Sequence, residues 1–238
     1  MEQSVLFEIE NNIASIILNR PDRSNAINQD LLKHLYDYMD KIIKDDNIYV
    51  AIITGKGKSF CSGIDLAAFE NDNLLDPRND GTDLPDIFAA CKKPIIGAIN
   101  GPAITGGLEL ALNCDFLIAS EKAVFADTHA KMGIHPGWGM TQLLQNAVGR
   151  PMAKQISFTG EFLSAEKAFQ CGLVNELIPH NELMIRTKQI AESICKCNFA
   201  MISVIKQLID KQNSANLSES FEYERNNCKK YFETFLKK

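Results

Sequence analysis

One continuous segment, from Lys93 to Ser120, constrains the fold of this chain more than any other. Its sequence, KPIIGAINGPAITGGLELALNCDFLIAS, predicts a buried strand, a glycine-rich turn, a short apolar helix and a second strand. A helix that begins at Gly106-Gly107 presents free backbone N–H groups and the positive end of its dipole to a ligand in front of it. Glu109 lies about one turn inside the same helix. A hydrogen-bond donor and a carboxylate on one helical turn favour chemistry on a carbonyl compound.

A second glycine turn, Ser59–Leu66, also follows a buried strand, and its pattern predicts entry into a helix. Asp65 would be an acid in the first turn of that helix, or simply its cap. The backbone N–H of Ile64 is expected to be unsatisfied at this strand-to-helix turn. Together with the N–H of Gly106 it supplies two converging donors, which is what an oxyanion hole requires.

Three further side chains are candidates for the site, and each has a structural alternative. Glu109 lies in the apolar run Leu108–Leu112, where an unpaired buried carboxylate is costly, so a functional role is favoured over an exposed helix face. His129 stands alone in its segment, and a lone histidine is more often structural than catalytic. Trp138, the only tryptophan, lies in a Pro-Gly-x-Gly loop, where it lines a pocket or closes the core.

Strands alternate with helices in the first part of the chain, which argues for an α/β core. The predicted strands are short, largely apolar runs at 5–10, 13–18, 49–54, 94–99 and 115–119. A tight Asn11-Asn12 turn joins the first two strands, and Asn28 caps an amphipathic helix that ends near Lys44. Residues 71–83 are rich in Asn, Asp, Pro and Gly and predict a surface loop, which a short helix at 84–91 follows.

Helix dominates from Trp138 onward. The helical patterns are at 142–147, 153–158, 165–170, 182–194, 201–213 and 217–236, with one strand-like run at 173–178. The chain is therefore divided into a core at 1–135 that carries the active site and a helical C-terminal region at 136–238.

Composition and charge exclude several classes of protein. The net charge of -5 gives no overall attraction to nucleic acid or to an anionic membrane surface. The longest apolar runs are far short of the roughly 18 residues that span a bilayer. The first twenty residues resemble neither a secretory signal nor a transit peptide, so a cytoplasmic location is expected. Seven cysteines, mostly in apolar surroundings, suit a reducing compartment better than a disulfide scaffold.

Other catalytic motifs have little support. Lys56-Gly57-Lys58-Ser59 follows a strand, but a phosphate-binding loop requires glycine at the position that Ile52 occupies. The chain has no G-x-S-x-G, and none of its cysteines has a histidine at a telling spacing. It also has no C-x-x-C, so no metal site is expected.

Taken in order, several segments of the chain resemble the crotonase superfamily, which is the enoyl-CoA hydratase/isomerase family. They are Leu18-Asn19-Arg20-Pro21 with Asn25-Ala26-Ile27-Asn28, Phe60–Leu66, Lys93-Pro94, Asn100-Gly101, Gly106–Ala111, Cys114-Asp115, Phe125-Ala126, Gly133, Pro136–Gln142 and Gly172-Leu173-Val174. The resemblance implies a spiral of ββα units, as in the ClpP/crotonase fold, with C-terminal helices that form homotrimers or dimers of trimers. It also implies a coenzyme A thioester as substrate and no separate cofactor.

The resemblance assigns roles to individual residues. It implies that the N–H groups of Ile64 and Gly106 form the oxyanion hole and that Glu109 is the first of two catalytic glutamates. The second glutamate is replaced by His129, and Thr105 replaces a frequent third glycine. The residues expected to contact the substrate are Ser62, Asp65, Leu66, Ala67 and Trp138.

The sequence therefore predicts a lyase that hydrates a 2-enoyl-CoA thioester. Glu109 would deprotonate the attacking water, and His129, with a reference pKa of about 6.5, would protonate C2. One alternative keeps the fold and the oxyanion hole but isomerises, decarboxylates or hydrolyses another acyl-CoA. Another alternative is a non-catalytic acyl-CoA binding protein.

Overall fold

A six-stranded sheet forms the centre of the computed structural model, which describes residues 3–68 and 71–212. Its strands in spatial order are β1 (Val5–Glu10), β2 (Ile13–Leu18), β3 (Val50–Gly55), β4 (Ile95–Ile99), β6 (Phe116–Ser120) and β9 (Glu176–Ile178). β1 runs antiparallel to β2, and the other neighbouring strands are parallel. Parallel pairing needs crossover connections, which helices commonly supply. The predicted α/β class is confirmed.

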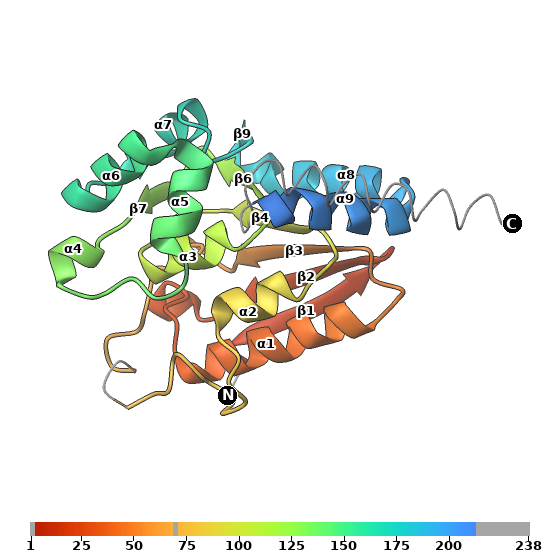
Figure 1. Ribbon diagram of the computed structural model, residues 1–238, viewed down its shortest axis with the longest axis horizontal. Coiled ribbons are helices and arrows are strands. Elements are labelled where there is room, and N and C mark those ends of the chain that lie inside the picture. The colour runs from red at the N-terminus through yellow and green to blue at the C-terminus, as the bar shows by residue number, and fades with distance from the viewer. Residues whose placement is uncertain (1–2, 69–70, 213–238) are drawn as a thin grey trace, which may run out of the picture.

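Helices cover both faces of this sheet (Figure 1). The longer ones are α1 (Gln29–Lys44), α5 (Met140–Val148), α6 (Arg150–Thr159), α8 (Leu183–Cys195) and α9 (Phe199–Gln212). The shorter ones are η1 (Pro21–Arg23), α2 (Leu84–Ala89), α3 (Gly106–Leu112), α4 (His129–Met132), α7 (Ala165–Gln170) and η2 (His180–Glu182). α1 packs on β1 and β2, whereas α8 packs on β2, β3, β4 and β6.

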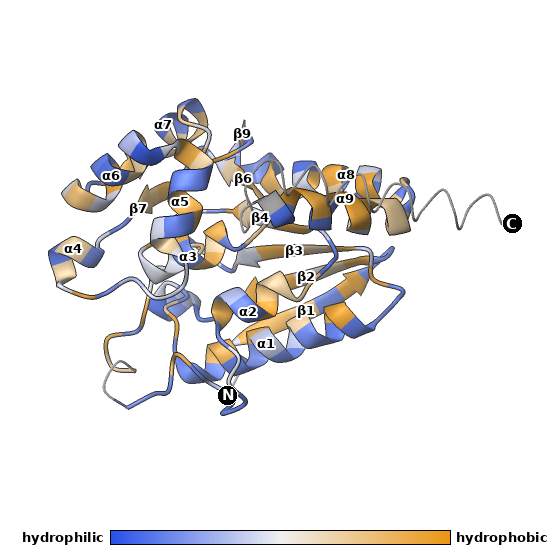
Figure 2. Ribbon diagram, viewed as in Figure 1, coloured by the Kyte–Doolittle hydropathy of each residue, from blue (hydrophilic) through white to orange (hydrophobic). Residues whose placement is uncertain are grey.

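The strand β3 shows why the sheet is buried on both faces. Val50 and Ile52 belong to the hydrophobic cluster beneath α8, and the alternate residues Ala51 and Ile53 belong to the main core, which also contains the apolar face of α1. Side chains alternate along a strand, so a central strand in contact with helices on both faces is apolar throughout. Figure 2 shows hydrophobic colour along β2–β4 and alternating polar and apolar turns on α1.

Two local signals in the sequence are confirmed. Asn11 and Asn12 both have positive φ, 50° and 67°, as the two central residues of a type I′ hairpin turn require. The side chain of Asn28 accepts a hydrogen bond of 3.0 Å from the N–H of Leu31, which satisfies one of the free donors at the start of α1.

A second, three-stranded sheet was not predicted. It consists of β5 (Ala103–Ile104), β7 (Val124–Ala126) and β8 (Leu163–Ser164), with β5 parallel to β7 and β7 antiparallel to β8. Strands of two or three residues are too short to show a period of two, so the sequence pattern carries no signal for them. This sheet places α3, which follows β5, beside α4, which follows β7.

The helix predicted to follow Asp65 is wrong, because residues 66–68 form a turn. Asp65 Oδ2 pairs with the Arg20 guanidinium at 2.9 Å, and its Oδ1 accepts from the N–H of Ala67 at 3.2 Å. A carboxylate that bonds the backbone two residues on forms an Asx turn, which competes with helix formation. The predicted role of Asp65 as a helix cap or first-turn acid is therefore corrected.

Most of the helices predicted after Trp138 are present, with ends displaced by up to about three residues. The helix predicted at 217–236 lies outside the described residues. The main hydrophobic cluster contains residues from both sides of position 135, including Phe125 and Leu144, and the division into 1–135 and 136–238 stays a prediction. Within residues 3–68 and 71–212, no helix is both long and apolar enough to cross a membrane.

Candidate active site

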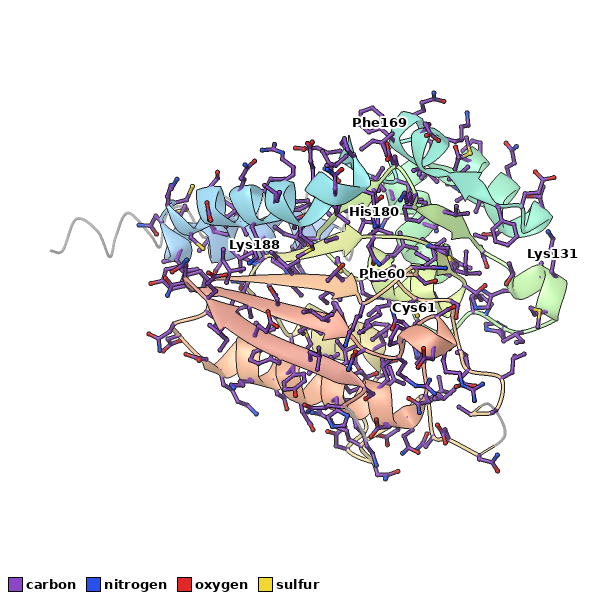
Figure 3. All side chains as sticks on the ribbon, turned by 180° about the vertical axis from the view of Figure 1, so that it is seen from behind. Phe60, Cys61, Lys131, Phe169, His180 and Lys188 are labelled. Carbon is purple, nitrogen blue, oxygen red and sulfur yellow. The ribbon has the colours of Figure 1, made fainter. Side chains whose placement is uncertain are left out.

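Three neighbouring segments of backbone converge at the candidate site. Cys61 forms a parallel bridge with Ala103, and Ala103 in turn pairs with Phe125 in the small sheet. Phe60 and Cys61, labelled in Figure 3, are fully buried. Three residues further along each segment come Ile64, Gly106 and Thr128, so the pairing of short strands brings these distant parts of the sequence together.

The backbone N–H groups of Ile64 and Gly106 lie close to each other. A Cβ placed on Gly106 would be 3.6 Å from the nitrogen of Ile64 and 3.4 Å from Cζ3 of Trp138. Within the part of the chain that the structure describes, neither N–H donates to another backbone group. The next residue must be glycine, because a Cβ on Gly107 would lie 2.1 Å from the carbonyl oxygen of Cys61.

Glu109 is held inside α3 by backbone donors from the loop before α5. Its Oε1 accepts hydrogen bonds from the N–H groups of Trp138 at 2.8 Å and Met140 at 3.4 Å. The side chain of Asn113 donates to the carbonyl oxygens of Glu109 and Trp138, which ties the helix to the same loop. Glu109 is 2% exposed, so its carboxylate is directed inward, and its Oε2 faces His129.

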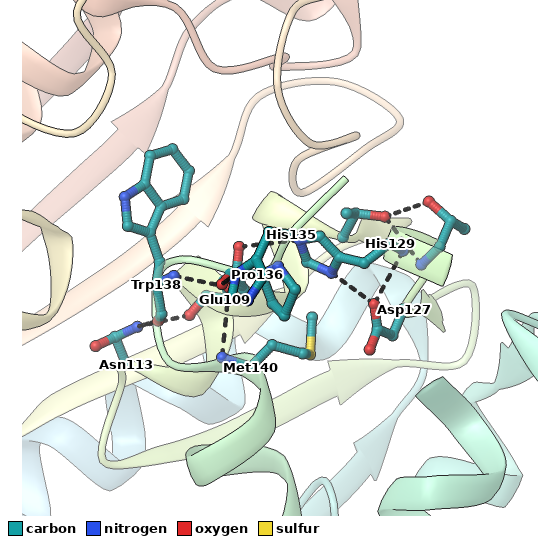
Figure 4. Close-up of polar contacts among 10 residues, drawn as sticks. Glu109, Asn113, Asp127, His129, His135, Pro136, Trp138 and Met140 are labelled. Carbon is teal, nitrogen blue, oxygen red and sulfur yellow. Dashed lines mark hydrogen bonds and ion pairs between the residues drawn. The ribbon is translucent and has the colours of Figure 1, made fainter. Parts of the chain in front are cut away.

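His129 faces Glu109 from the first turn of α4. Its Nε2 lies 3.6 Å from Oε2 of Glu109, an ion-pair distance that is longer than a hydrogen bond. Its Nδ1 lies 2.7 Å from Oδ1 of Asp127. Figure 4 shows the imidazole between the two carboxylates. Both His129 and Asp127 are buried, whereas Lys131 lies at the outer edge of the molecule (Figure 3).

The environment shifts the pKa of each of these three groups. Burial raises the pKa of Glu109, although the Trp138 N–H and the nearby His129 oppose the rise. Burial alone would lower the pKa of His129, but the hydrogen bond to Asp127 and the charges of both carboxylates raise it overall. Burial alone would raise the pKa of Asp127, but hydrogen bonds from His129 and Ser157 lower it overall. These directions favour an ionised Asp127 and a protonated His129.

A pair of threonine hydroxyls connects the starts of α3 and α4. Thr105 Oγ1 lies 2.5 Å from Thr128 Oγ1 and accepts from the Thr128 N–H at 3.1 Å. Thr105 has φ 51° and ψ −109°, a conformation that is strained for a β-branched residue. The residue at the position of the frequent third glycine is thus retained in a glycine-like conformation by the contacts of its hydroxyl.

The residues expected to contact a substrate differ from one another in burial and in their contacts. Ser62 is half-buried and donates its N–H to the carbonyl of Ser24. Leu66, which is 69% exposed, and Ala67 lie on the open turn after Ile64. Asp65 on the same turn is engaged by Arg20. The Trp138 ring is buried beside Gly106, and its indole N–H has no hydrogen-bond partner among the described residues.

Asp127 was given no role from the sequence, because it lies two residues from the position of the second glutamate, but the structure places it in contact with His129. Asp127 and His129 have Asp-x-His spacing, but they pair because Asp127 follows strand β7 and α4 begins at His129. The backbone donors to Glu109 were also missed. The Pro-Gly-x-Gly loop around Trp138 was noticed, yet its sequence does not reveal which N–H groups point at α3.

The assembled groups can act together on one small ligand. Two free N–H groups can hold an oxyanion, and a buried carboxylate with a raised pKa can act as a base. An imidazole at ion-pair distance from this base can donate a proton. An acid, a base and oxyanion donors are the elements needed to add or remove a small molecule next to a carbonyl group.

Comparisons with known proteins give one consistent picture. The model of the enoyl-CoA hydratase/isomerase family matches residues 8–238. The chain is 38% identical over 225 residues to a probable peroxisomal enoyl-CoA hydratase 1 of Arabidopsis thaliana, covering 94% of this chain and 85% of that protein. It is 39% identical over 196 residues to a crotonyl-CoA hydratase of Syntrophomonas wolfei, covering 81% and 75%.

Solved structures agree with these sequence relationships. The enoyl-CoA hydratase subunit I of Geobacillus kaustophilus superimposes with a TM-score of 0.89 at 31% identity, covering 96% of this chain and 90% of that chain. The expected crotonase-like fold, a spiral of ββα units, is therefore confirmed.

Proposed function

The chain belongs to the enoyl-CoA hydratase/isomerase family, and from that premise we propose that it adds water across the 2,3 double bond of a 2-enoyl-CoA thioester. One observation carries the proposal. The Oε2 atom of Glu109 and the Nε2 atom of His129 lie 3.6 Å apart and are buried, and the helix that carries Glu109 begins at Gly106, whose N–H, like that of Ile64, donates to no backbone group among the described residues. The names of the relatives, which include a crotonyl-CoA hydratase, support the same reaction.

The two N–H groups form the oxyanion hole of the proposed mechanism. They donate to the thioester oxygen, polarise the conjugated system and stabilise the enolate-like transition state. Removing one such donor typically costs about 10²- to 10³-fold in kcat. Both donors belong to backbone fixed by strand pairing at Cys61 and Ala103, so they need no reorganisation during the reaction.

Glu109 is the general base of the proposed reaction. Its Oε1 is occupied by the Trp138 N–H, which leaves Oε2 to take a proton from the water that attacks C3. Burial raises the pKa of Glu109 and so makes it a stronger base than an exposed glutamate. A general base of this kind typically contributes about 10²- to 10⁴-fold to the rate.

His129 is the general acid of the proposed reaction. Its Nε2 proton passes to C2, so the product carries one hydrogen at C2 and one hydroxyl at C3. The hydrogen bond to Asp127 and the charges of both carboxylates raise the pKa of His129, which favours the protonated imidazole that this role requires. Activity is therefore expected to fall as pH rises through the pKa of His129, and to fall as pH decreases through the pKa of Glu109. The kcat profile is bell-shaped on this mechanism.

For the bound substrate, we propose that the pantetheine arm lies along Ser62 and the turn Asp65–Ala67. The Trp138 ring would then lie against the acyl group. Coenzyme A is part of the substrate, and the proposed chemistry needs no separate cofactor or metal. Activity should consequently survive prolonged treatment with a chelator. Homotrimers or dimers of trimers are proposed from the family and can be measured by light scattering. The cytoplasmic location stays a prediction, because one relative is named as peroxisomal.

The test is the loss of the conjugated enoyl-thioester absorbance with crotonyl-CoA and with a longer 2-enoyl-CoA. The expected product is the 3-hydroxyacyl-CoA, identified by mass spectrometry. Binding of both thioesters with no loss of absorbance would contradict hydration. Incubation with 3-enoyl and malonyl-type thioesters, followed by product analysis, would then identify isomerisation, decarboxylation or hydrolysis.

A further inference from the structure

Asp127 accepts two hydrogen bonds from His129. Its Oδ1 accepts from the imidazole Nδ1 at 2.7 Å and from the backbone N–H of His129 at 3.2 Å, and the residue is 2% exposed. An ionised carboxylate can only accept hydrogen bonds, so Nδ1 must carry a proton. The neutral imidazole is therefore restricted to the Nδ1–H form.

This restriction determines what Nε2 presents to Glu109. A neutral Nδ1–H imidazole has a lone pair at Nε2, and the ionised Glu109 has only acceptors at Oε2. Two acceptors that face each other at 3.6 Å repel unless a proton lies on one of them. The geometry therefore favours one proton shared between Nε2 and Oε2.

We propose that Asp127 is the positioning residue that fixes the tautomer of His129 and makes Glu109 and His129 a one-proton pair. The inference rests on the proposed hydration, whose acid and base it links. Asp127 bonds His129 and acts through its imidazole. With a carboxylate on its far side, the histidine can replace a carboxylic acid as the proton donor at C2.

The proton balance of the reaction closes with this pair. A lone pair of the water oxygen forms the C3–O bond while Glu109 Oε2 takes one of the water protons. The electron pair of the C2=C3 bond moves towards the thioester oxygen and then takes the Nε2 proton at C2. The enzyme is left with a protonated Glu109 and a neutral His129. Transfer of that proton from Oε2 to Nε2 restores the starting state.

The charged groups around His129 are few. Glu109 faces it from α3, and Asp127 faces it from the end of β7. The helix α6 packs against α4 and contributes the uncharged Ser157, which hydrogen-bonds Asp127. The cations of α6, Arg150 and Lys154, are not among the groups that shift the pKa of His129. Neutralising Asp127 therefore removes one of the two charges that contact the imidazole among the described residues.

The first experiment uses the wild-type protein without substrate. The ¹⁵N signals of the four histidines are recorded by NMR across pH, and His129 is assigned from the signals that disappear in His129→Gln. The expected result is a neutral imidazole protonated at Nδ1 and a titration midpoint above that of an exposed histidine. A neutral imidazole protonated at Nε2, the form preferred in water, would overturn the inference.

The second experiment compares Asp127→Asn with Asp115→Asn. Asp115 is a matched control, because its Oδ2 also accepts from a backbone N–H, that of Ile95, and from a cation, that of Lys206. Asp127→Asn is expected to lower kcat with crotonyl-CoA about 10²-fold and to move its high-pH limb to lower pH. Asp115→Asn should leave the position of that limb unchanged.

The outcomes separate the two proposals. A high-pH limb and a His129 titration that stay in place in Asp127→Asn would overturn the role of Asp127. A wild-type protein that shows the Nδ1–H form but hydrates no enoyl-CoA would overturn the proposed function instead. If Asp127→Asn does not fold, as judged by circular dichroism, the tautomer of the wild-type protein decides the question alone.

Discussion

Around Glu109 the candidate site is closed and hydrogen-bonded, whereas Leu66 on the turn after Ile64, and Leu75, which lies against Gly137 next to Trp138, are open to solvent. On the closed side, backbone N–H groups hold Glu109 and a carboxylate holds His129. On the open side, Leu66 is 69% and Leu75 is 65% exposed. Groups that perform chemistry must be fixed to a fraction of an ångström, whereas surfaces that hold a flexible substrate can order when it binds. The contrast predicts that substitutions on the two sides have very different consequences.

The largest effect is expected from Glu109→Gln. Glutamine keeps the acceptor for the Trp138 N–H but cannot take a proton from water. We expect kcat with crotonyl-CoA to fall about 10²- to 10⁴-fold, measured by the loss of enoyl-thioester absorbance. The control is Glu176→Gln, which removes a carboxylate of β9 that pairs with Arg186 of α8. Equal activity of Glu109→Gln and the wild type would break the comparison, because the closed side would then have no catalytic role.

Next in size is Gly106→Ala, which tests the oxyanion donors. The new Cβ would meet Ile64 Cγ1 at 3.5 Å and Trp138 Cζ3 at 3.4 Å, so the fold has room for it. The same methyl group lies 3.6 Å from the Ile64 nitrogen, beside the position of the thioester oxygen. We expect kcat to fall about 10²- to 10³-fold with an unchanged thermal unfolding temperature. Unimpaired turnover would place the oxyanion hole elsewhere.

Substitutions of Thr105 test how far the stability of the closed side depends on backbone strain at this residue. Thr105→Gly relieves the positive φ but loses the bonds to Thr128, so we expect the free energy of unfolding to change by only about 1 kcal/mol. Thr105→Val keeps the strained shape and loses the same bonds, and it should lose about 1–3 kcal/mol. Urea unfolding of both variants checks the order. A glycine variant that is less stable than the valine variant would show that strain plays no part here.

The smallest effect is expected from Leu75→Ala on the open side. Leu75 lies against Gly137, with its Cδ2 3.8 Å from the position of a Cβ there, but most of its surface is in water. We expect stability to change by less than about 0.5 kcal/mol and kcat with crotonyl-CoA to stay unchanged. KM for a long-chain 2-enoyl-CoA should rise, whereas the control Ile185→Ala, an exposed residue of α8, should leave it alone. A large loss of kcat would erase the contrast between the two sides.

On the closed side, the sequence predicted the local structure around Gly106 and Glu109, where a short helix follows a buried strand. Gly106 and Glu109 lie in a continuous strand–turn–helix pattern, and local periodicity carries that information. His129 and Asp127 were harder, because their contact depends on β7, a strand of three residues without a periodic signal. The error at Asp65 has a similar origin. Its partner Arg20 lies 45 positions away, and a local pattern cannot show that a distant arginine engages the carboxylate.

The central claim is that Glu109 and His129 act as one proton-transferring pair, and a double-variant cycle tests it most directly. Initial rates with crotonyl-CoA are measured for Glu109→Gln, His129→Gln and the double variant, and binding of the saturated butyryl-CoA is measured in parallel. Residues that act as a unit have strongly non-additive effects on the rate. We therefore predict that the double variant loses no more activity than the worse single variant, while all bind butyryl-CoA alike. Losses that multiply would contradict the pair.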